Sequence, residues 1–478
     1  MEENRIIGRE EEIRQLNLIM EEKGSAFVVI YGRRRVGKTF LVNQYFKNNF
    51  AFKCTGLAKK GKEDQLDNFG AALNRYAEQD CTFCTPKSWM EAFESLRQLL
   101  SSKTDRRKNV VFIDELPWMD TPKSNLVTAL ENFWNDWGST RNDIVFIVCG
   151  SATSWITKKI LKNKGGLHNR TDFRIYIHPF NLYETRLFLQ SRGIVLSDKE
   201  IVEAYMIMGG IPFYLKQIQK GRSLSQNVDE MFFRKNGRLD GEYRELYYSL
   251  YNNPEAYLKV IEALGSKNEG LTREELLKAT KLEDNGHFKE ILENLDQCAI
   301  IRRYKGYGKT VKSSIFQLID PFTLFHLRFI RKYGTSEKPF WIHQIGTRVH
   351  DTWAGLAFEE VCLLHRLQIE RKLQIGGIQT EVYAWRSSDQ NEKAQIDLVI
   401  KRADKVVNIC EMKFYDSEFL FTKKLHDEIS RKVRIFKNDC KLYNRAIHPI
   451  MVTTYAFTPN EYSQIIQDTV LMGDLFAQ

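Results

Sequence analysis

The chain has little cysteine and no long apolar run. Its 478 residues include 8 cysteines, and two of them, Cys149 and Cys410, lie in apolar segments where a thiol serves as a small core side chain. Cys81 and Cys84 form a lone C-x-x-C, which without a second pair nearby is more often incidental than a zinc or redox site. No apolar run is long enough to span a bilayer, and the first residues are acidic and polar rather than secretory. We therefore expect a cytoplasmic protein with no membrane partner.

Size and charge set the next limits. A chain of 478 residues is too long for one core, so two to four domains are expected. Hydrophobic residues make up 43% and charged residues 28%, which are ordinary values for a globular protein. The net charge of +10 favours a polyanionic partner. Acidic and basic residues are mixed over most of the chain, so this charge alone does not locate a binding surface.

A phosphate-binding loop lies near the start of the chain. Residues 32–39 read G-x-x-x-x-G-K-T, after an apolar run at 26–30 typical of a buried parallel strand and before a helical pattern at 40–46. Gly32 and Gly37 let the backbone fold around phosphate oxygens. Lys38 is expected to reach the β- and γ-phosphates, and the Thr39 hydroxyl to bind Mg²⁺. The alternative, a glycine-rich turn that matches by chance, does not explain the flanking strand and helix.

A second apolar strand pattern, residues 110–113, ends in Asp114 and Glu115. Downstream of a phosphate-binding loop, such an aspartate holds Mg²⁺ and the adjacent glutamate polarises the attacking water. The pair therefore predicts ATP hydrolysis, with Glu115 as the catalytic residue and Asp114 as the metal-binding residue.

Two further residues are candidates with open alternatives. Ser151 follows the apolar run 144–149, and because the carboxyl ends of parallel strands face the ligand, it is placed to sense the γ-phosphate or the water. It can equally be part of a strand-end turn. Arg170 precedes the strand-like residues 173–177 and is either an arginine finger or a solvated loop charge.

These segments together resemble the archaeal-type ATPase family, a branch of the AAA+/STAND P-loop ATPases. The resemblance covers the first half of the chain and rests on residues 7–10, 32–39, 112–115, 149–151 and 209–215. It implies ATP and Mg²⁺ as cofactors. The segment 209–215 resembles the Gly-x-Pro signature of STAND proteins, which implies that Pro212 lies in a helical lid near the adenine. The lid lacks a second sensor arginine, a departure that puts hexameric ring motor action in doubt.

After a helix-rich segment, residues 253–336 predict a winged helix. Three short helical patterns are followed by two strand-like segments, 300–304 and 314–318. No acid occurs between Ile301 and Ile319, whereas this stretch holds the basic residues Arg302, Arg303, Lys305, Lys309 and Lys312. Together with Tyr304 and Tyr307, they favour contact with a DNA backbone. A winged helix that only contacts protein remains the alternative.

In the last part of the chain, two strand-like segments each contain an acidic residue. Asp397 lies in the apolar run 395–400, and Glu411 and Lys413 lie in 407–414. Because side chains alternate along a strand, Glu411 and Lys413 share a face, and Asp397 on a paired strand can meet them. Two carboxylates form a hard-oxygen site for Mg²⁺, and a lysine beside it can orient a water or stabilise developing charge. The alternative is a solvated cross-strand pair.

This Asp…Glu-x-Lys pattern resembles the PD-(D/E)xK nuclease superfamily, whose domain is commonly fused to archaeal-type ATPases. The resemblance implies that Glu359, in the helical pattern 355–364, is the helix acid that completes the metal site. The proline of the superfamily's name is absent, since Gln395 and Ile396 precede Asp397.

The expected fold is therefore an α/β P-loop core (1–180), a helical lid (181–252), a winged helix (253–336) and a restriction-endonuclease-like α/β domain (337–478). The expected function is an ATPase coupled to binding of double-stranded DNA and to Mg²⁺-dependent cleavage. The alternative is a STAND-like switch that binds DNA or a partner protein without cutting. The sequence leaves the oligomeric state open.

Overall fold

The computed structural model describes residues 5–78, 82–103, 108–162, 165–166, 170–251, 253–304, 306–307, 314–387 and 392–478. The chain divides into two compact units. The first comprises residues 1–179 and 248–252, and the second comprises 180–247 and 253–478. The segments that the sequence predicts as winged helix and C-terminal domain thus share the second unit with most of the predicted lid, whose residues 248–252 belong to the first unit.

The first unit is built on a five-stranded parallel sheet in the order β2-β3-β4-β1-β5. The strands are β1 Ala26–Tyr31, β2 Phe52–Thr55, β3 Asn109–Asp114, β4 Ile144–Gly150 and β5 Phe173–Tyr176. The residues of β3 and β4 are all buried, as expected for a parallel sheet covered on both faces. The predicted α/β core with a parallel sheet is confirmed.

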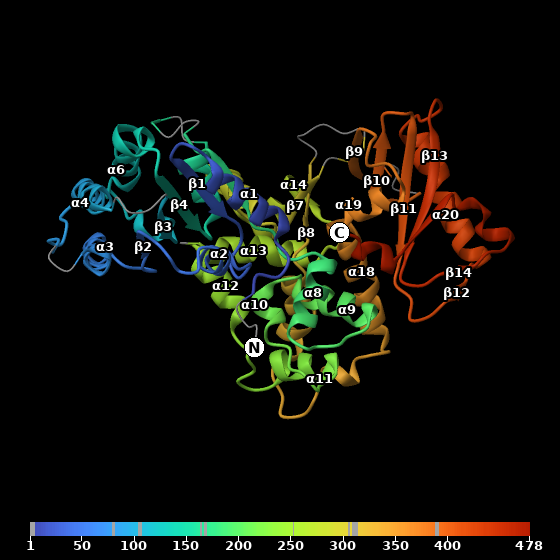
Figure 1. The fold of residues 1–478 in the computed structure, drawn as a ribbon. Coiled ribbons are helices and arrows are strands. Elements are labelled where there is room, and N and C mark those ends of the chain that lie inside the picture. Colours follow the sequence, from blue (N-terminus) through green and yellow to red (C-terminus); the bar gives the residue numbers. More distant parts are fainter. Residues whose placement is uncertain are drawn as a thin grey trace. The chain divides into compact units, whose positions relative to one another are not determined.

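Helices surround this sheet (Figure 1), and those from α3 to α6 contribute aromatic and aliphatic side chains to its core. In chain order they are α1 Glu10–Glu21, α2 Lys38–Tyr45, α3 Lys62–Tyr76, α4 Trp89–Ser102, α5 Leu116–Met119, α6 Leu126–Asn132 and α7 Thr153–Trp155. Ser88 caps α4 by accepting a hydrogen bond from the Glu91 amide. The buried rings of Phe69, Trp89 and Phe93 join α3 and α4 into one core.

The second unit begins with short helices. They are α8 Leu182–Ser191, α9 Asp198–Met208, α10 Pro212–Leu215, α11 Leu224–Val228 and α12 Glu242–Leu250, the last of which crosses the unit boundary. Gly209 and Gly210 both have positive φ between α9 and α10. A Cβ on Gly210 would lie 2.1 Å from the Phe180 carbonyl oxygen, so the turn requires glycine.

Three helices and a small antiparallel sheet follow. The helices are α13 Pro254–Gly265, α14 Arg273–Thr280 and α15 Gly286–Gln297. The strands β6 Leu271–Thr272, β7 Ile301–Tyr304 and β8 Ile315–Leu318 form a sheet in the order β6-β8-β7. Thr272 and Glu275 form a capping box at the start of α14. Two short helices, α16 Pro321–Phe325 and α17 Arg331–Tyr333, lead to the last part of the chain.

The C-terminal part contains a mixed five-stranded sheet in the order β15-β13-β11-β10-β9. Its elements are α18 Arg348–Leu364, α19 Arg366–Lys372, β9 Thr380–Arg386, β10 Gln395–Arg402, β11 Val406–Lys413, α20 Lys423–Asp439, β13 Ala446–Thr453 and β15 Asp468–Leu471. The strands β12 Phe419–Leu420 and β14 Phe457–Thr458 pair separately. The pairs β9–β10 and β10–β11 are antiparallel, whereas β11–β13 and β13–β15 are parallel.

Two described residues between β7 and β8, Gly306 and Tyr307, contact this sheet. Gly306 bridges to Ala384 of β9, and the Tyr307 ring contacts Tyr383 and Phe436. The Tyr304 hydroxyl donates to the Glu269 carbonyl oxygen. Both tyrosines thus make contacts within the chain, Tyr304 through its hydroxyl and Tyr307 through its ring. Lys305, Lys309 and Lys312 lie outside the described residues.

Within the described residues, no helix is long and apolar enough to cross a membrane. All cysteines in that part of the chain are free, and most of them are buried.

Candidate active sites

The phosphate-binding loop has the geometry that its glycines predict. Gly32 has a φ of 147° and Gly37 a φ of 93°. A Cβ on Gly32 would lie 2.4 Å from the Ile177 carbonyl oxygen, so no other residue fits there. Helix α2 begins at Lys38, directly after Gly37, so the loop ends at a helix N-terminus. Such an N-terminus favours anions through its free amides and dipole.

Lys38 is held inside the loop. Its ammonium donates to the carbonyl oxygens of Gly32 at 2.9 Å and Arg33 at 2.8 Å. The side chain is buried, and both acceptors are backbone groups without net charge. The cation is thus oriented by the loop and carries charge that a phosphate would compensate.

Thr39 and Asp114 meet at the ends of α2 and β3. The Thr39 hydroxyl donates to Asp114 Oδ2 at 2.8 Å, and the Glu115 amide donates to Oδ1 at 3.1 Å. Mg²⁺ prefers oxygen ligands and is commonly held by one or two carboxylates together with phosphates and waters. A buried carboxylate in contact with a threonine hydroxyl fits that requirement, so these residues would hold the Mg²⁺ of an ATP complex.

Glu115 and Ser151 form a second pair beside the loop. Glu115 has a φ of 47°, an uncommon conformation for a non-glycine residue. Its Oε2 accepts from the Ser151 amide at 3.0 Å, and its Oε1 accepts from the Ser151 hydroxyl at 2.5 Å. A Cβ on Gly150 would lie 2.7 Å from Pro117, so the preceding glycine permits this close approach of β4 to α5. The geometry brings two of the predicted catalytic residues into contact.

Arg9 is absent from the predicted site residues, although it contacts the loop. Its guanidinium donates to the Val36 carbonyl oxygen at 3.2 Å and to Glu12 at 3.3 Å, and the residue is only 5% exposed. The signal in the sequence is the Gly8-Arg9 pair, where both residues have positive φ. Such a turn directs a side chain back toward the loop.

Arg170 and Pro212 lie elsewhere. Arg170 is exposed and precedes β5. Because Phe173 pairs with Val28, Arg170 is at the amino ends of the strands, opposite the phosphate-binding loop. A finger role would thus require contact with another chain. Pro212 begins α10 in the second unit, and its predicted contact with adenine stays a prediction.

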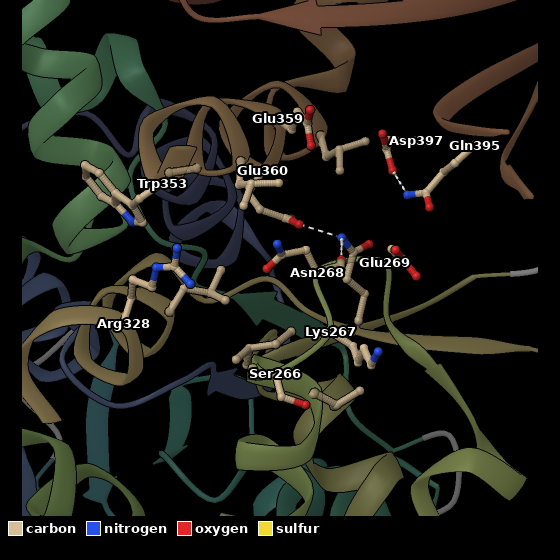
Figure 2. Close-up of a pocket in the computed structure, with 18 of the residues that line it drawn as sticks. Ser266, Lys267, Asn268, Glu269, Arg328, Trp353, Glu359, Glu360, Gln395 and Asp397 are labelled. Atoms are coloured by element: carbon tan, nitrogen blue, oxygen red, sulfur yellow. Dashed lines mark hydrogen bonds between the residues drawn. The ribbon is translucent and has the colours of Figure 1, made fainter. Parts of the chain in front are cut away.

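The acid–lysine site lies on adjacent strands of the C-terminal sheet. The pairing of β10 with β11 ends at Leu398 and Cys410, and β10 has a bulge between Ile396 and Val399, so Asp397 and Glu411 are the residues just beyond the last paired step. Lys413 forms an ion pair with Glu411 Oε1 at 2.7 Å. The Gln395 amide donates to Asp397 Oδ1, as Figure 2 shows. The predicted spacing on the two strands therefore brings the three charged residues to one region of the sheet.

Glu411 is clamped by two lysines. Lys432 of α20, a residue that sequence reasoning missed, contacts Glu411 Oε2 at 2.8 Å and Glu428 at 3.3 Å. Burial opposes ionisation of Glu411, but Lys413 and Lys432 outweigh it and hold the pKa of this carboxyl below its ordinary value. Burial likewise opposes the charge on Lys413, yet Glu411 raises the pKa of the ammonium. Both charges are thus maintained.

The two acids of α18 behave in the opposite way. Burial, and then the nearby Asp397 carboxylate, raise the pKa of Glu359 well above its ordinary value. Burial also raises the pKa of Glu360 to about 7, with the Arg302 charge opposing it. Gln317 donates to Glu360 Oε1 at 2.6 Å. Glu359 is therefore close enough to Asp397 to feel its charge. Glu411, in contrast, is compensated by direct ion pairs with two lysines.

The predicted three-acid metal site is not assembled in this arrangement. Within the described ranges, no three His, Cys, Asp or Glu side chains form a group that could hold a metal ion. The reason is that Glu411 pairs with two lysines rather than converging with Asp397 and Glu359. Two carboxylates on neighbouring strands still suit Mg²⁺, which keeps several waters.

A cavity of about 660 Å³ opens beside these acids. Figure 2 shows Glu359, Glu360 and Asp397 around it, with Trp353 and Arg328 on the other side. The loop 266–269 also lines it and is fixed by Gln317 and Arg386, whose side chains donate to its carbonyl oxygens. The cavity is large enough for a small ligand.

Comparison with known proteins supports the first of these sites. Residues 6–218 match a family described as an ATPase domain predominantly from Archaea. This part of the chain is a P-loop ATPase-like domain. The match spans less than half of the chain, so the remainder is interpreted from its own geometry.

An uncharacterized protein of Methanocaldococcus jannaschii is 25% identical over 434 residues, which cover 90% of this chain and 92% of the relative. Among solved structures, a Walker-type ATPase of Pyrococcus abyssi has a TM-score of 0.49 at 18% identity, covering 68% of this chain and 96% of that one. The ORC2 protein of Aeropyrum pernix in ADPNP–ADP complexes has a TM-score of 0.43 at 12% identity, covering 68% of this chain and 95% of that one.

Proposed function

We propose that this chain is an ATP-hydrolysing, DNA-directed enzyme that cuts phosphodiester bonds with Mg²⁺ at its C-terminal site. The observation that carries the nuclease part is that Asp397 and Glu411 directly follow the last paired residues of neighbouring strands, with Lys413 ion-paired to Glu411. The ATPase part rests on the contact between Thr39 and Asp114 at the phosphate-binding loop.

In the ATPase-like domain, Lys38 and the loop amides would bind the phosphates. Thr39 and Asp114 would hold Mg²⁺, whose charge stabilises the transferring phosphoryl group. Glu115 would accept a proton from the attacking water. In its present contacts both carboxylate oxygens of Glu115 accept from Ser151, so Ser151 orients the carboxylate and must share it with the water.

The order of elements in the C-terminal part supports a restriction-endonuclease-like fold. Helix α18, antiparallel strands β9, β10 and β11, helix α20 and parallel strand β13 follow one another in the chain. Asp397 and Glu411 would hold Mg²⁺, which supplies a Lewis acid next to the scissile phosphate. Lys413 would orient the attacking water or stabilise charge on the phosphate.

The helices α13, α14 and α15 with the β6-β8-β7 sheet have the composition of a winged helix, which we propose binds DNA. Arg303 is its exposed basic residue on β7 and lines a cavity of about 360 Å³ together with Arg273 and Lys289. These cations would contact the phosphate backbone. Arg302, in contrast, donates to Gln317 within the chain.

A plasmid-cleavage assay with Mn²⁺ or Mg²⁺, with and without ATP, tests the proposal. Metal-dependent nicking that is lost in Asp397→Asn and in Lys413→Ala is the expected result. Glu392→Gln, an exposed acid near the same strand, is the matched control and should cut normally. Absence of nicking by the intact chain under all these conditions would remove the nuclease part and leave the ATPase part to be judged by phosphate release.

A second function is favoured by one observation. Because Lys413 and Lys432 already neutralise Glu411, the site is stable without metal, and the chain could act as a nucleotide-dependent switch that binds DNA or a partner protein without cutting. In that case Mn²⁺ would not raise the thermal midpoint of the chain in a Lys38→Ala background, where metal bound with nucleotide is removed.

A further inference from the structure

Loop 266–269 is tied down at two points beside the cavity that Asp397 lines. At the first point, the side-chain amide of Gln317 donates to the Asn268 carbonyl oxygen at 2.7 Å and to Glu360 Oε1 at 2.6 Å. Both bonds start from one nitrogen, so the loop carbonyl lies only two hydrogen-bond lengths from a carboxylate of α18. Figure 2 shows this loop together with Glu360 and Asp397 around the cavity.

The second point lies beside the start of β10. Arg386 of β9 donates to the carbonyl oxygens of Glu269 and Gly270. Arg386 is also the strand partner of Gln395, whose side chain donates to the Asp397 carboxylate. The loop is therefore anchored to α18 on one side and, on the other, to the strand next to the one that carries Asp397.

This enclosure is too narrow for an intact duplex. The major groove of B-form DNA is alone about 12 Å wide, and a duplex must bring both of its backbones past the site. The cavity of about 660 Å³ is lined by loop 266–269, by α18, by residues of 321–328 and by the start of β10. Pockets of about 300–1,000 Å³ hold small ligands, so this one has room for on the order of one or two nucleotides of a separated strand.

The lining offers contacts for both parts of a nucleotide. Half-buried leucine side chains present apolar surface to the cavity; they are Leu324, Leu327, Leu356 and Leu363. Lys267, Arg328 and Lys393 are exposed on the same lining, and within the part of the chain that the structure describes they form no ion pair. Phosphates would compensate these charges, and apolar contact accepts a base of any sequence because it is not directional.

We infer that this cavity receives one unpaired strand of DNA and excludes the intact duplex, with loop 266–269 as the excluding element. The inference rests on the proposed DNA-directed function and names its substrate class as duplex DNA that continues into a single-stranded segment. The duplex would lie on the winged helix, and the separated strand would bring a phosphate to Asp397. That carboxylate is only half-buried and lines the cavity.

The first test measures binding by the full chain in an Asp397→Asn background, which removes a charge that repels phosphate. Fluorescence anisotropy in EDTA compares a labelled single strand with the blunt duplex of the same sequence. Lys267→Gln should weaken single-strand binding about 5-fold and reduce its salt slope by about 0.7, as for the loss of one phosphate contact. Duplex binding should be unchanged, because the winged helix provides it.

Lys259→Gln is the matched control for this test, because Lys259 is exposed on α13 and lies outside the cavity lining. It should change neither affinity. Equal losses of single-strand and duplex affinity in Lys267→Gln, or no loss of either, would overturn the inference.

The second test releases the loop. In Mn²⁺ the unaltered chain should cut the single strand about 10-fold faster than the blunt duplex. Arg386→Met keeps a long side chain but removes the bonds to the loop carbonyls, so duplex cutting should rise and the ratio should fall. Arg371→Met, exposed on α19, should keep the original ratio. Misfolding cannot speed duplex cutting, and an unchanged ratio in Arg386→Met would mean that the loop does not exclude the duplex.

Two further outcomes identify which proposal fails. If Lys267→Gln lowers single-strand affinity selectively but no DNA is cut in Mn²⁺, the nuclease step is wrong and the strand cavity is supported. If single strand and blunt duplex are cut at equal rates, the nuclease step is supported and the inference is wrong. A negatively supercoiled plasmid, whose strands separate more easily, should likewise be nicked faster than its relaxed form, and equal nicking would count against the inference.

Discussion

The two candidate sites treat charge in opposite ways. At the phosphate-binding loop, Lys38 is held by neutral carbonyl oxygens of Gly32 and Arg33. At the C-terminal site, Glu411 is held by two charged lysines, Lys413 and Lys432. In the described part of the chain, the Lys38 ammonium bonds to neutral carbonyl oxygens, so the first site is organised for an anion. The second is already neutralised, so a metal ion must compete with ammonium groups. We infer that the first site binds a phosphate strongly, and that the second binds a metal ion only when the ion displaces the lysine ammonium groups from Glu411.

The largest expected effect concerns hydrolysis at the first site. Glu115→Gln removes the carboxylate that would accept the proton of the water, while the Thr39–Asp114 contact is kept. ATP turnover should fall by about 10²- to 10⁴-fold with little change in ATP affinity. Steady-state phosphate release and calorimetric titration measure the two quantities. Glu63→Gln, an exposed acid on α3, is the control, and turnover at the wild-type rate in Glu115→Gln would mean that another residue positions the water.

Next in size is the loss of nucleotide binding in Lys38→Ala. The substitution removes a loop cation that is bonded to backbone carbonyl oxygens, so affinity for ATP should fall about 100-fold, as for the loss of charge-assisted bonds to two phosphates. The far-ultraviolet circular dichroism spectrum should be unchanged. Lys87→Ala, which is exposed just before α4, should bind as the unaltered chain does. If Lys38→Ala and Lys87→Ala bind ATP equally well, Lys38 is not the cation that binds the phosphates.

The second site should depend on pH because its helix α18 is anchored by a buried histidine. His365 Nε2 accepts from the Leu182 amide at 2.9 Å, and Nδ1 contacts the Val361 carbonyl oxygen at 2.7 Å. Burial lowers the pKa of His365 to about 4. The unfolded chain, with an ordinary histidine pKa near 6.5, therefore binds more protons between these values, and stability is lost as pH falls from about 6.5 toward 4.

The loss should reach about 2 to 3 kcal/mol for the second unit. His365→Gln keeps an acceptor for Leu182 and cannot titrate in this range, so its urea midpoint should be lower at pH 7.5 but change less toward pH 5. His343→Gln, at an exposed position, should follow the unaltered chain. If His365→Gln shows the same pH slope as the unaltered chain, other groups cause the acid sensitivity.

The smallest expected effect tests the clamp on Glu411. Lys432→Met removes one of the two ammonium groups, so Mn²⁺ should bind about 3- to 10-fold more tightly, as for the removal of one partly screened ion pair. Lys437→Met, near the exposed end of the same helix, is the control. The measurement is the Mn²⁺ dependence of the thermal midpoint in a Lys38→Ala background. A smaller midpoint shift in Lys432→Met than in Lys437→Met would show that Lys432 assists metal binding rather than competing with it.

The sequence predicts the C-terminal sheet less completely than the nucleotide core. It predicts strands for Asp397 and for Glu411 with Lys413, and these residues lie on the neighbouring strands β10 and β11. It does not predict Lys432, because this lysine reaches Glu411 from α20 across the fold. It also does not predict that Tyr307 packs on Phe436, since a tyrosine in a basic turn has the same local pattern whether it faces DNA or another part of the chain.

The sequence by itself determined the phosphate-binding loop, because its function depends on backbone conformation within eight consecutive residues, and glycines at 32 and 37 mark that conformation directly. It also indicated the buried strands near residues 26–30, 110–113 and 144–149, which follow from their apolar runs. Only the tertiary structure decided the charge balance at Glu411 and the cavity at Trp353 and Glu360. Those features arise where side chains from several distant elements meet, and the burial that sets their pKa values has no local signature in the chain.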